Sequence, residues 1–206
     1  MVESYINLIK GGEGEIVEKK SRFIGQIKPV SSEEQAYAFV EEIKKKHYAA
    51  RHNCFAFSVG VEQPLLRFSD DGEPQGTAGK PILEVITSSE IHNICIVVTR
   101  YFGGTLLGTG GLIRAYTDAS KEALSQCETK LMERLIPADI RTNYTDIGKL
   151  QYILGNHDVK IIDTVYADDV LVKINLRKNE SDSIIKELTD ATSARAKIST
   201  FDEIYG

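Results

Sequence analysis

The feature that most restricts the fold of this chain is a glycine-rich segment between an apolar run and an amphipathic run. Five of the 16 glycines lie within nine residues, from Gly103 to Gly111. Before them, Asn93–Tyr101 is rich in β-branched residues and predicts a strand, and after them Gly111–Cys127 has apolar residues at helical spacing. Because glycine adopts positive φ angles and lets other groups approach closely, we expect a strand, a tight loop and a helix packed near a sheet.

The same segment is suited to binding an anion. A helix N-terminus offers unpaired N–H groups and the positive end of the helix dipole, and arginines flank the glycines on both sides. The alternative is that the glycines serve only to let the helix pack tightly on the sheet. The expected anion-binding residues are Arg100, Gly103, Gly104, Gly108, Thr109, Gly110, Gly111 and Arg114.

Neither of two well-known phosphate-binding motifs fits this segment. A P-loop has Lys and then Ser or Thr after its last glycine, but Thr109 and Gly110 follow Gly108. In the dinucleotide fingerprint a third glycine would stand where the chain has Ile113. The sequence therefore predicts a generic anion site and leaves the class of anion open.

Composition and charge exclude several classes of protein. The net charge of −5, from 25 basic and 30 acidic residues, argues against wrapping by nucleic acid, although a local basic patch stays possible. Three cysteines without short spacing indicate reduced thiols and no zinc site. The longest aliphatic stretch, Ile94–Val98, is too short to cross a bilayer. We expect a cytoplasmic protein with no membrane partner, cofactor or metal.

Residues 1–135 form the first expected domain. Ser31 and Glu34 have capping-box spacing and predict a helix start, with Ala36, Val40 and Ile43 on the buried face. A second helix is expected near residues 78–86. The expected strands are 5–9, 15–20, 23–30, 53–59 and 65–68, in addition to the one before the glycines.

Residues 136–206 form the second expected domain. Their pattern is strand 138–144, helix 146–154, strands 159–166 and 170–176, helix 181–191 and strand 197–204. A β-α-β-β-α-β order in so short a segment predicts a ferredoxin-like fold.

Polar side chains near the expected strand ends suggest a second kind of site. His52 stands at the start of one strand, and Asp70, Asp71 and Glu73 follow another. These carboxylates could hold magnesium and His52 could move a proton, which is the alternative of an enzyme or sensor acting on a small phosphorylated ligand. A solvated turn and a structural histidine would give the same pattern.

Several of these segments, taken together and in order, resemble the YigZ/IMPACT family of bacterial and eukaryotic proteins. The resemblance covers roughly residues 15–125 in the first domain, and residues 136–204 resemble the small C-terminal domain of bacterial members. It is carried by Lys20–Ile24, Arg51–Cys54, Ser69–Pro74, Gly76–Gly79, Arg100–Gly104, Leu107–Gly108 and Gly110–Tyr116.

The resemblance implies an α+β fold in two domains. The first would be an α+β sandwich of the kind shared by a small-subunit ribosomal protein and the GHMP kinases, and the second a ferredoxin-like βαββαβ domain. It also implies a non-enzymatic binding role linked to translation, with a ribosome, RNA, a translation factor or a small anionic ligand as the partner. Because one fold supports many functions, these remain expectations.

Overall fold

The computed structural model describes residues 2–206 and divides into two compact units. The first unit ends at Leu131 and the second begins at Met132, a few residues before the predicted boundary. Strand β8 (Glu128–Thr142) begins in the first unit and continues into the second. Both units mix helices with sheet, so the fold class is α+β, as the sequence predicts.

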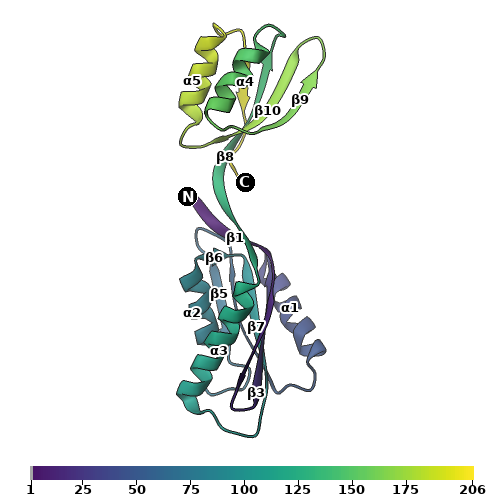
Figure 1. Cartoon of the computed structure of the whole chain (residues 1–206), viewed down its shortest axis with the longest axis vertical. Coiled ribbons are helices and arrows are strands. Elements are labelled where there is room, and N and C mark those ends of the chain that lie inside the picture. Colours follow the sequence, from purple (N-terminus) through teal and green to yellow (C-terminus); the bar gives the residue numbers. More distant parts are fainter. Residues whose placement is uncertain (1) are drawn as a thin grey trace. The chain divides into compact units, whose positions relative to one another are not determined.

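The first unit is built on a five-stranded antiparallel sheet in the order β2-β3-β7-β4-β5 (Figure 1). Outside it, β1 (Ser4–Lys10) pairs in parallel with the two-residue strand β6 (Ile91–His92). The five strands are β2 (Glu13–Glu18), β3 (Ser21–Pro29), β4 (His52–Val59), β5 (Leu65–Ser69) and β7 (Ile94–Tyr101). The helices are α1 (Glu33–Lys46), α2 (Gly79–Ser89) and α3 (Gly108–Ser125).

Helices cover both faces of this sheet (Figure 1). Successive side chains of a strand point to opposite faces, so β7 contributes to two cores. Ile94, Ile96 and Val98 pack with α2 and α3, whereas Cys95 and Val97 pack with α1. Because both faces are buried, this strand reads in the sequence as a continuous apolar run.

The start of α1 differs by one residue from the prediction. The N-cap is Ser32, whose side chain accepts a hydrogen bond from the Gln35 N–H at 3.2 Å. The Gln35 side chain in turn accepts from the Ser31 N–H at 2.9 Å. The expected capping box of Ser31 and Glu34 was therefore wrong in register, because the adjacent pair satisfies the same pattern. The expected buried face is confirmed for Ala36, Val40 and Ile43.

Helix α3 begins earlier than expected, at Gly108 rather than Gly111. Glycine disfavours helix, so propensity alone places the start too late. Burial of Leu112 and Ala115 against the sheet holds the next turn in place. The glycines at the end of the window are thus the first turn of the helix itself.

Strand β8 is also longer than the predicted 138–144, because it begins at Glu128. Proline cannot donate to a sheet, so Pro137 suggested a break between domains. In the structure Pro137 lies within the strand, and its carbonyl accepts from the Phe201 N–H at 2.9 Å.

The second unit has the predicted β-α-β-β-α-β order. Its antiparallel sheet runs β11-β8-β10-β9, which is the ferredoxin-like arrangement. A terminal strand, β12 (Ile204–Tyr205), also pairs with β8. The other elements are α4 (Ile147–Asn156), β9 (Ile161–Tyr166), β10 (Val170–Arg177), α5 (Ser181–Ala191) and β11 (Lys197–Thr200). Over residues 2–206, no helix combines the length and the hydropathy needed to cross a bilayer.

Candidate anion-binding site

The glycine window places an open helix N-terminus at the surface. Leu107 is the N-cap of α3, and among the described residues no side chain caps this end of the helix. Gly108 and Gly110 are exposed, and a Cβ atom added to either would meet nothing within 4 Å. The first N–H groups of a helix have no partner within the helix, so this turn offers donors to a ligand from solvent.

Helix α2 shows what an occupied N-terminus looks like in the same unit. The Asp70 carboxylate accepts hydrogen bonds from the N–H groups of Gly76 at 2.8 Å, Ala78 at 3.0 Å and Gly79 at 2.8 Å. A carboxylate of the chain itself therefore occupies the anion position at that helix. At α3 the first turn carries no acidic side chain.

Gly103 has a different role from the glycines of the helix. A Cβ atom there would lie 2.0 Å from the Lys20 carbonyl carbon, and the Gly103 N–H donates to the Ser21 Oγ at 3.0 Å. Close packing thus explains Gly103, and its amide already has a partner. Gly104 has a φ of +88°, which suits the turn that leads to the helix.

Arg100 is buried on β7, shortly before the window, and is paired. Its Nη1 donates to Glu73 Oε1 at 2.6 Å, and the same oxygen accepts from the Tyr116 hydroxyl at 2.8 Å. The side chains of Arg100 and Glu73 are only 7% and 3% exposed. Within residues 2–206 the Arg100 Nε has no hydrogen-bond partner.

The sheet register explains why Arg100 is there. Arg100 is directly opposite Phe23 on one neighbouring strand and His52 on the other, so the three side chains share one face near one end of the sheet. The guanidinium carbon lies 5.4 Å from the Phe23 ring centre and 5.5 Å from that of Phe102.

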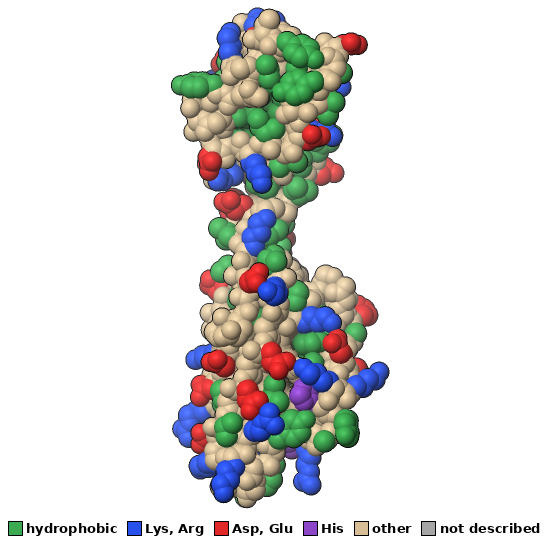
Figure 2. All heavy atoms as spheres, turned by 45° about the vertical axis from the view of Figure 1, so that its right-hand side comes forward, with side chains coloured by type: hydrophobic (Ala, Val, Ile, Leu, Met, Phe, Trp, Pro, Cys, Tyr) green, Lys and Arg blue, Asp and Glu red, His purple; other side chains and the backbone are tan. Residues whose placement is uncertain are grey.

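The other predicted cation, Arg114, is exposed on the second turn of α3. Over one face of the first unit, acidic and basic side chains are intermixed (Figure 2). On this face, attraction of an anion must therefore come from local groups rather than from a broad positive surface.

The carboxylates of the alternative site do not converge. Asp70 binds the amides before α2, Asp71 Oδ2 accepts from the Asn53 N–H at 2.7 Å, and Glu73 is held by Arg100. No group of three acidic, histidine or cysteine side chains arranged to hold a metal occurs in the described chain. The structure therefore does not bring these three carboxylates together as the expected magnesium site, and each of them already has a partner within the protein.

His52 is oriented by the backbone. Its Nδ1 lies 2.9 Å from the Asp71 carbonyl oxygen, which can only accept, so Nδ1 carries a proton, and in the neutral ring Nε2 is an acceptor. With Glu73, Arg100 and three further side chains, His52 lines a cavity of about 270 Å³. Those three are Arg51, Phe102 and Leu106, none of which was among the predicted site residues.

Burial argues against a reactive thiol beside this cavity. Burial raises the pKa of the Cys54 thiol far above its ordinary value, and also that of the Tyr116 hydroxyl. The Cys54 Sγ donates to the Asp70 carbonyl at 2.9 Å. Because the thiolate is the nucleophile, Cys54 is a packing residue here.

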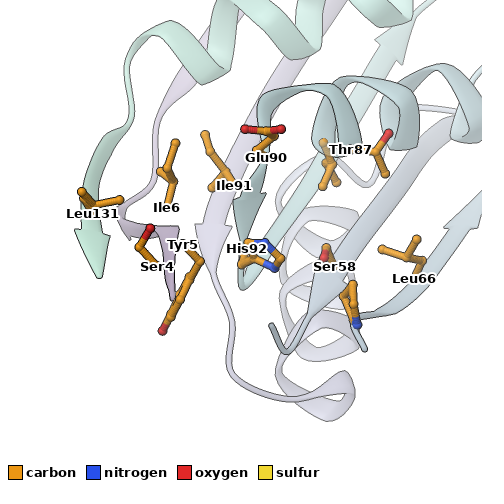
Figure 3. Close-up of a pocket in the computed structure, with 12 residues that line it drawn as sticks. Ser4, Tyr5, Ile6, Ser58, Leu66, Thr87, Glu90, Ile91, His92 and Leu131 are labelled. Atoms are coloured by element: carbon orange, nitrogen blue, oxygen red, sulfur yellow. The ribbon is translucent and has the colours of Figure 1, made fainter. Parts of the chain in front are cut away.

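A larger cavity, of about 530 Å³, lies elsewhere in the first unit (Figure 3). Tyr5 and Ile6 of β1 line it together with Ile91 and His92 of β6, and Thr87 lines it from α2. No sequence pattern indicates this cavity, because its residues come from segments without shared chemistry.

His92 forms part of the wall of this larger cavity. Its Nδ1 lies 3.0 Å from the Gly60 carbonyl oxygen, and its ring meets that of Tyr5 edge to face. Both contacts give the histidine a structural role.

Comparison with known proteins shows to which family this chain belongs. Residues 19–124 match the Impact N-terminal domain, and residues 140–195 match a domain of unknown function (DUF1949). The IMPACT family member YvyE of Bacillus subtilis is 37% identical over 208 residues, which cover 100% of this chain and 94% of that protein. The chain belongs to the IMPACT family.

Other IMPACT proteins show how far the likeness extends. The family member YigZ of Escherichia coli is 37% identical, over 90% of this chain and 92% of its own length. A Protein IMPACT homolog of Saccharomyces cerevisiae is 31% identical over 96 residues, 45% of this chain and 37% of that protein. A crystal structure of a hypothetical protein matches 98% of this chain with 35% identity and a TM-score of 0.63.

Proposed function

We propose that this IMPACT family member is a non-enzymatic, translation-linked regulatory protein that binds an anionic group, an RNA phosphate or a nucleotide, at the N-terminus of α3. The observation that carries the proposal is the exposed first turn of this helix, whose glycines offer N–H donors with no side-chain cap. Arg114 adds an exposed positive charge on the next turn.

A second observation supports a ligand at this place. Arg100 lines the cavity to which Phe102 and Leu106 of the loop contribute, is only 7% exposed and keeps its Nε without a partner. A buried donor without a partner costs free energy, and a water, an ion or a ligand group that accepts from it would recover that cost. The link to translation comes from the family resemblance alone.

The test changes the charge of the helix start without disturbing its packing. In Gly110→Asp, the added side chain meets open space, and a carboxylate at a helix N-terminus is favourable to the helix. We expect this variant to remain folded and to lose cosedimentation with ribosomes at low salt, because its own carboxylate occupies the anion position.

Gly148→Asp is the matched control. Gly148 lies in the first turn of α4, is exposed and also has nothing within 4 Å of a Cβ atom. For the arginine, Arg114→Ala is compared with Lys121→Ala, since Lys121 is exposed seven residues further along the same helix. If neither Gly110→Asp nor Arg114→Ala changes the association with ribosomes, the proposal is refuted.

A further inference from the structure

The cavity of about 270 Å³ adjoins the proposed anion site. Leu106 lines the cavity and stands two residues before Gly108, so their Cα atoms are at most about 7 Å apart. Phe102, Leu106 and the start of α3 belong to one loop-and-helix segment. A ligand with its phosphate on α3 thus has room for the rest of its structure in this cavity.

The wall of the cavity offers an aromatic face. Phe102 is 53% exposed, and its ring centre lies 5.5 Å from the Arg100 guanidinium carbon. Leu106 beside it is 82% exposed. An exposed ring backed by a guanidinium plane is a platform on which unpaired nucleobases stack.

The remaining wall offers hydrogen-bonding groups of both kinds. In its neutral form His52 presents Nε2 as an acceptor, because Nδ1 donates to the backbone. Arg51 is exposed and supplies donors. A nucleobase edge carries donors and acceptors side by side and suits such a mixed wall, whereas a bare phosphate does not.

The charges favour a ligand that carries phosphate. Glu73 neutralises Arg100, which leaves Arg51 at the cavity and Arg114 on α3 as positive groups. We infer that the cavity binds the base of one nucleoside monophosphate unit, free or within single-stranded RNA, while its phosphate lies on the N-terminus of α3. The inference rests on the proposed function and names the ligand class of that site.

The chain contains no tryptophan, so a single introduced tryptophan reports on one place. Phe102→Trp keeps an aromatic ring at the cavity, and Phe201→Trp is the control, since Phe201 is 55% exposed in the second unit. Each full-length variant is titrated with inorganic phosphate, ribose 5-phosphate, the four nucleoside monophosphates and single-stranded hexanucleotides.

We expect the emission of Phe102→Trp to be quenched by nucleoside monophosphates and hexanucleotides, and to stay constant with phosphate or ribose 5-phosphate. The emission of Phe201→Trp should not change. Phe102→Ala should weaken nucleotide binding by roughly 5- to 150-fold, as loss of one stacked base does, and leave phosphate binding unchanged. Tighter binding of hexanucleotides than of free nucleotides would identify RNA as the source, and equal binding the free nucleotide.

Two results separate the failure of this inference from that of the proposed function. Suppose that Gly110→Asp loses phosphate binding, but nucleotides neither quench the emission of Phe102→Trp nor bind more tightly than phosphate does. The base site is then refuted and the anion site stands. If phosphate, nucleotides and hexanucleotides all fail to bind the folded protein, both proposals are refuted.

Discussion

Removing one member of the buried Arg100–Glu73 pair should destabilise the first unit strongly. In Glu73→Leu the guanidinium keeps its charge inside the protein without a partner, and the Tyr116 hydroxyl loses its acceptor. The double variant Glu73→Leu/Arg100→Leu removes both charges together. Because the cost comes from the charge left alone, we expect the double variant to be more stable than the single variant.

The structure sets the magnitude. The two charged atoms are 2.6 Å apart, which at an effective dielectric constant of about 20 gives a gross attraction of about 6 kcal/mol. Desolvation of both groups offsets much of this attraction, and breaking a buried pair typically costs about 3–5 kcal/mol. We expect Glu73→Leu to lower the free energy of unfolding of the first unit by that amount, and the second substitution to recover more than half of it.

The measurement must report on the first unit alone. Native-state hydrogen exchange of the β7 amides does so, because the slowest of these amides exchange through global unfolding of their own unit. The control is Glu42→Ala, which removes the partner of Lys28 at 2.9 Å, where the two side chains are 61% and 50% exposed. In this control, the free energy of unfolding should fall by less than about 1 kcal/mol. A double variant less stable than Glu73→Leu would refute the reasoning.

Three further outcomes follow from other contacts. The hydrogen bond from Arg195 holds the pKa of Asp146 below its ordinary value, so the second unit should lose stability as the pH falls below about 4. In acid unfolding, Asp146→Asn should show a smaller loss of stability over the same pH range. Burial lowers the pKa of His47, so its neutral form stabilises the first unit above about pH 6.5. The free energy of unfolding of this unit should therefore fall as the pH is lowered from about 6.5, and should fall less in His47→Gln. Hydrogen exchange at pH 7 and pH 5 measures this difference. Gly103→Ala should lower the midpoint of thermal unfolding, because its Cβ would collide with the backbone. Gly110→Ala should raise the midpoint by the equivalent of roughly 0.5–1 kcal/mol. Equal shifts of the midpoint in the two variants would contradict the packing argument.

The sequence predicted the elements whose patterns are local. The continuous apolar run of β7, the helical spacing after the glycines and the order of elements in the second unit all follow from hydrophobic patterning. Boundaries were less predictable where two local patterns compete, as with Ser31 and Ser32, or where tertiary pairing overrides a breaker, as with Pro137 in β8.

The candidate site could be predicted only in part. The exposed glycine turn follows from the strand, glycine and helix pattern. The pairing of Arg100 with Glu73 does not, because the two are 27 residues apart and meet only when β7 lies at the centre of the sheet. Burial therefore changed Arg100 from an expected surface cation into a paired group. The cavity wall from Phe102 and Leu106 likewise depends on the loop's path.

The central claim is that the first turn of α3 holds negative charge through its N–H groups. A titration of uniformly ¹⁵N-labelled protein with inorganic phosphate, followed amide by amide, tests it most directly. The account predicts saturable shifts concentrated at residues 108–111, and their loss in Gly110→Asp but not in Gly148→Asp. Shifts of equal size at the start of α4, or none at residues 108–111, would contradict it.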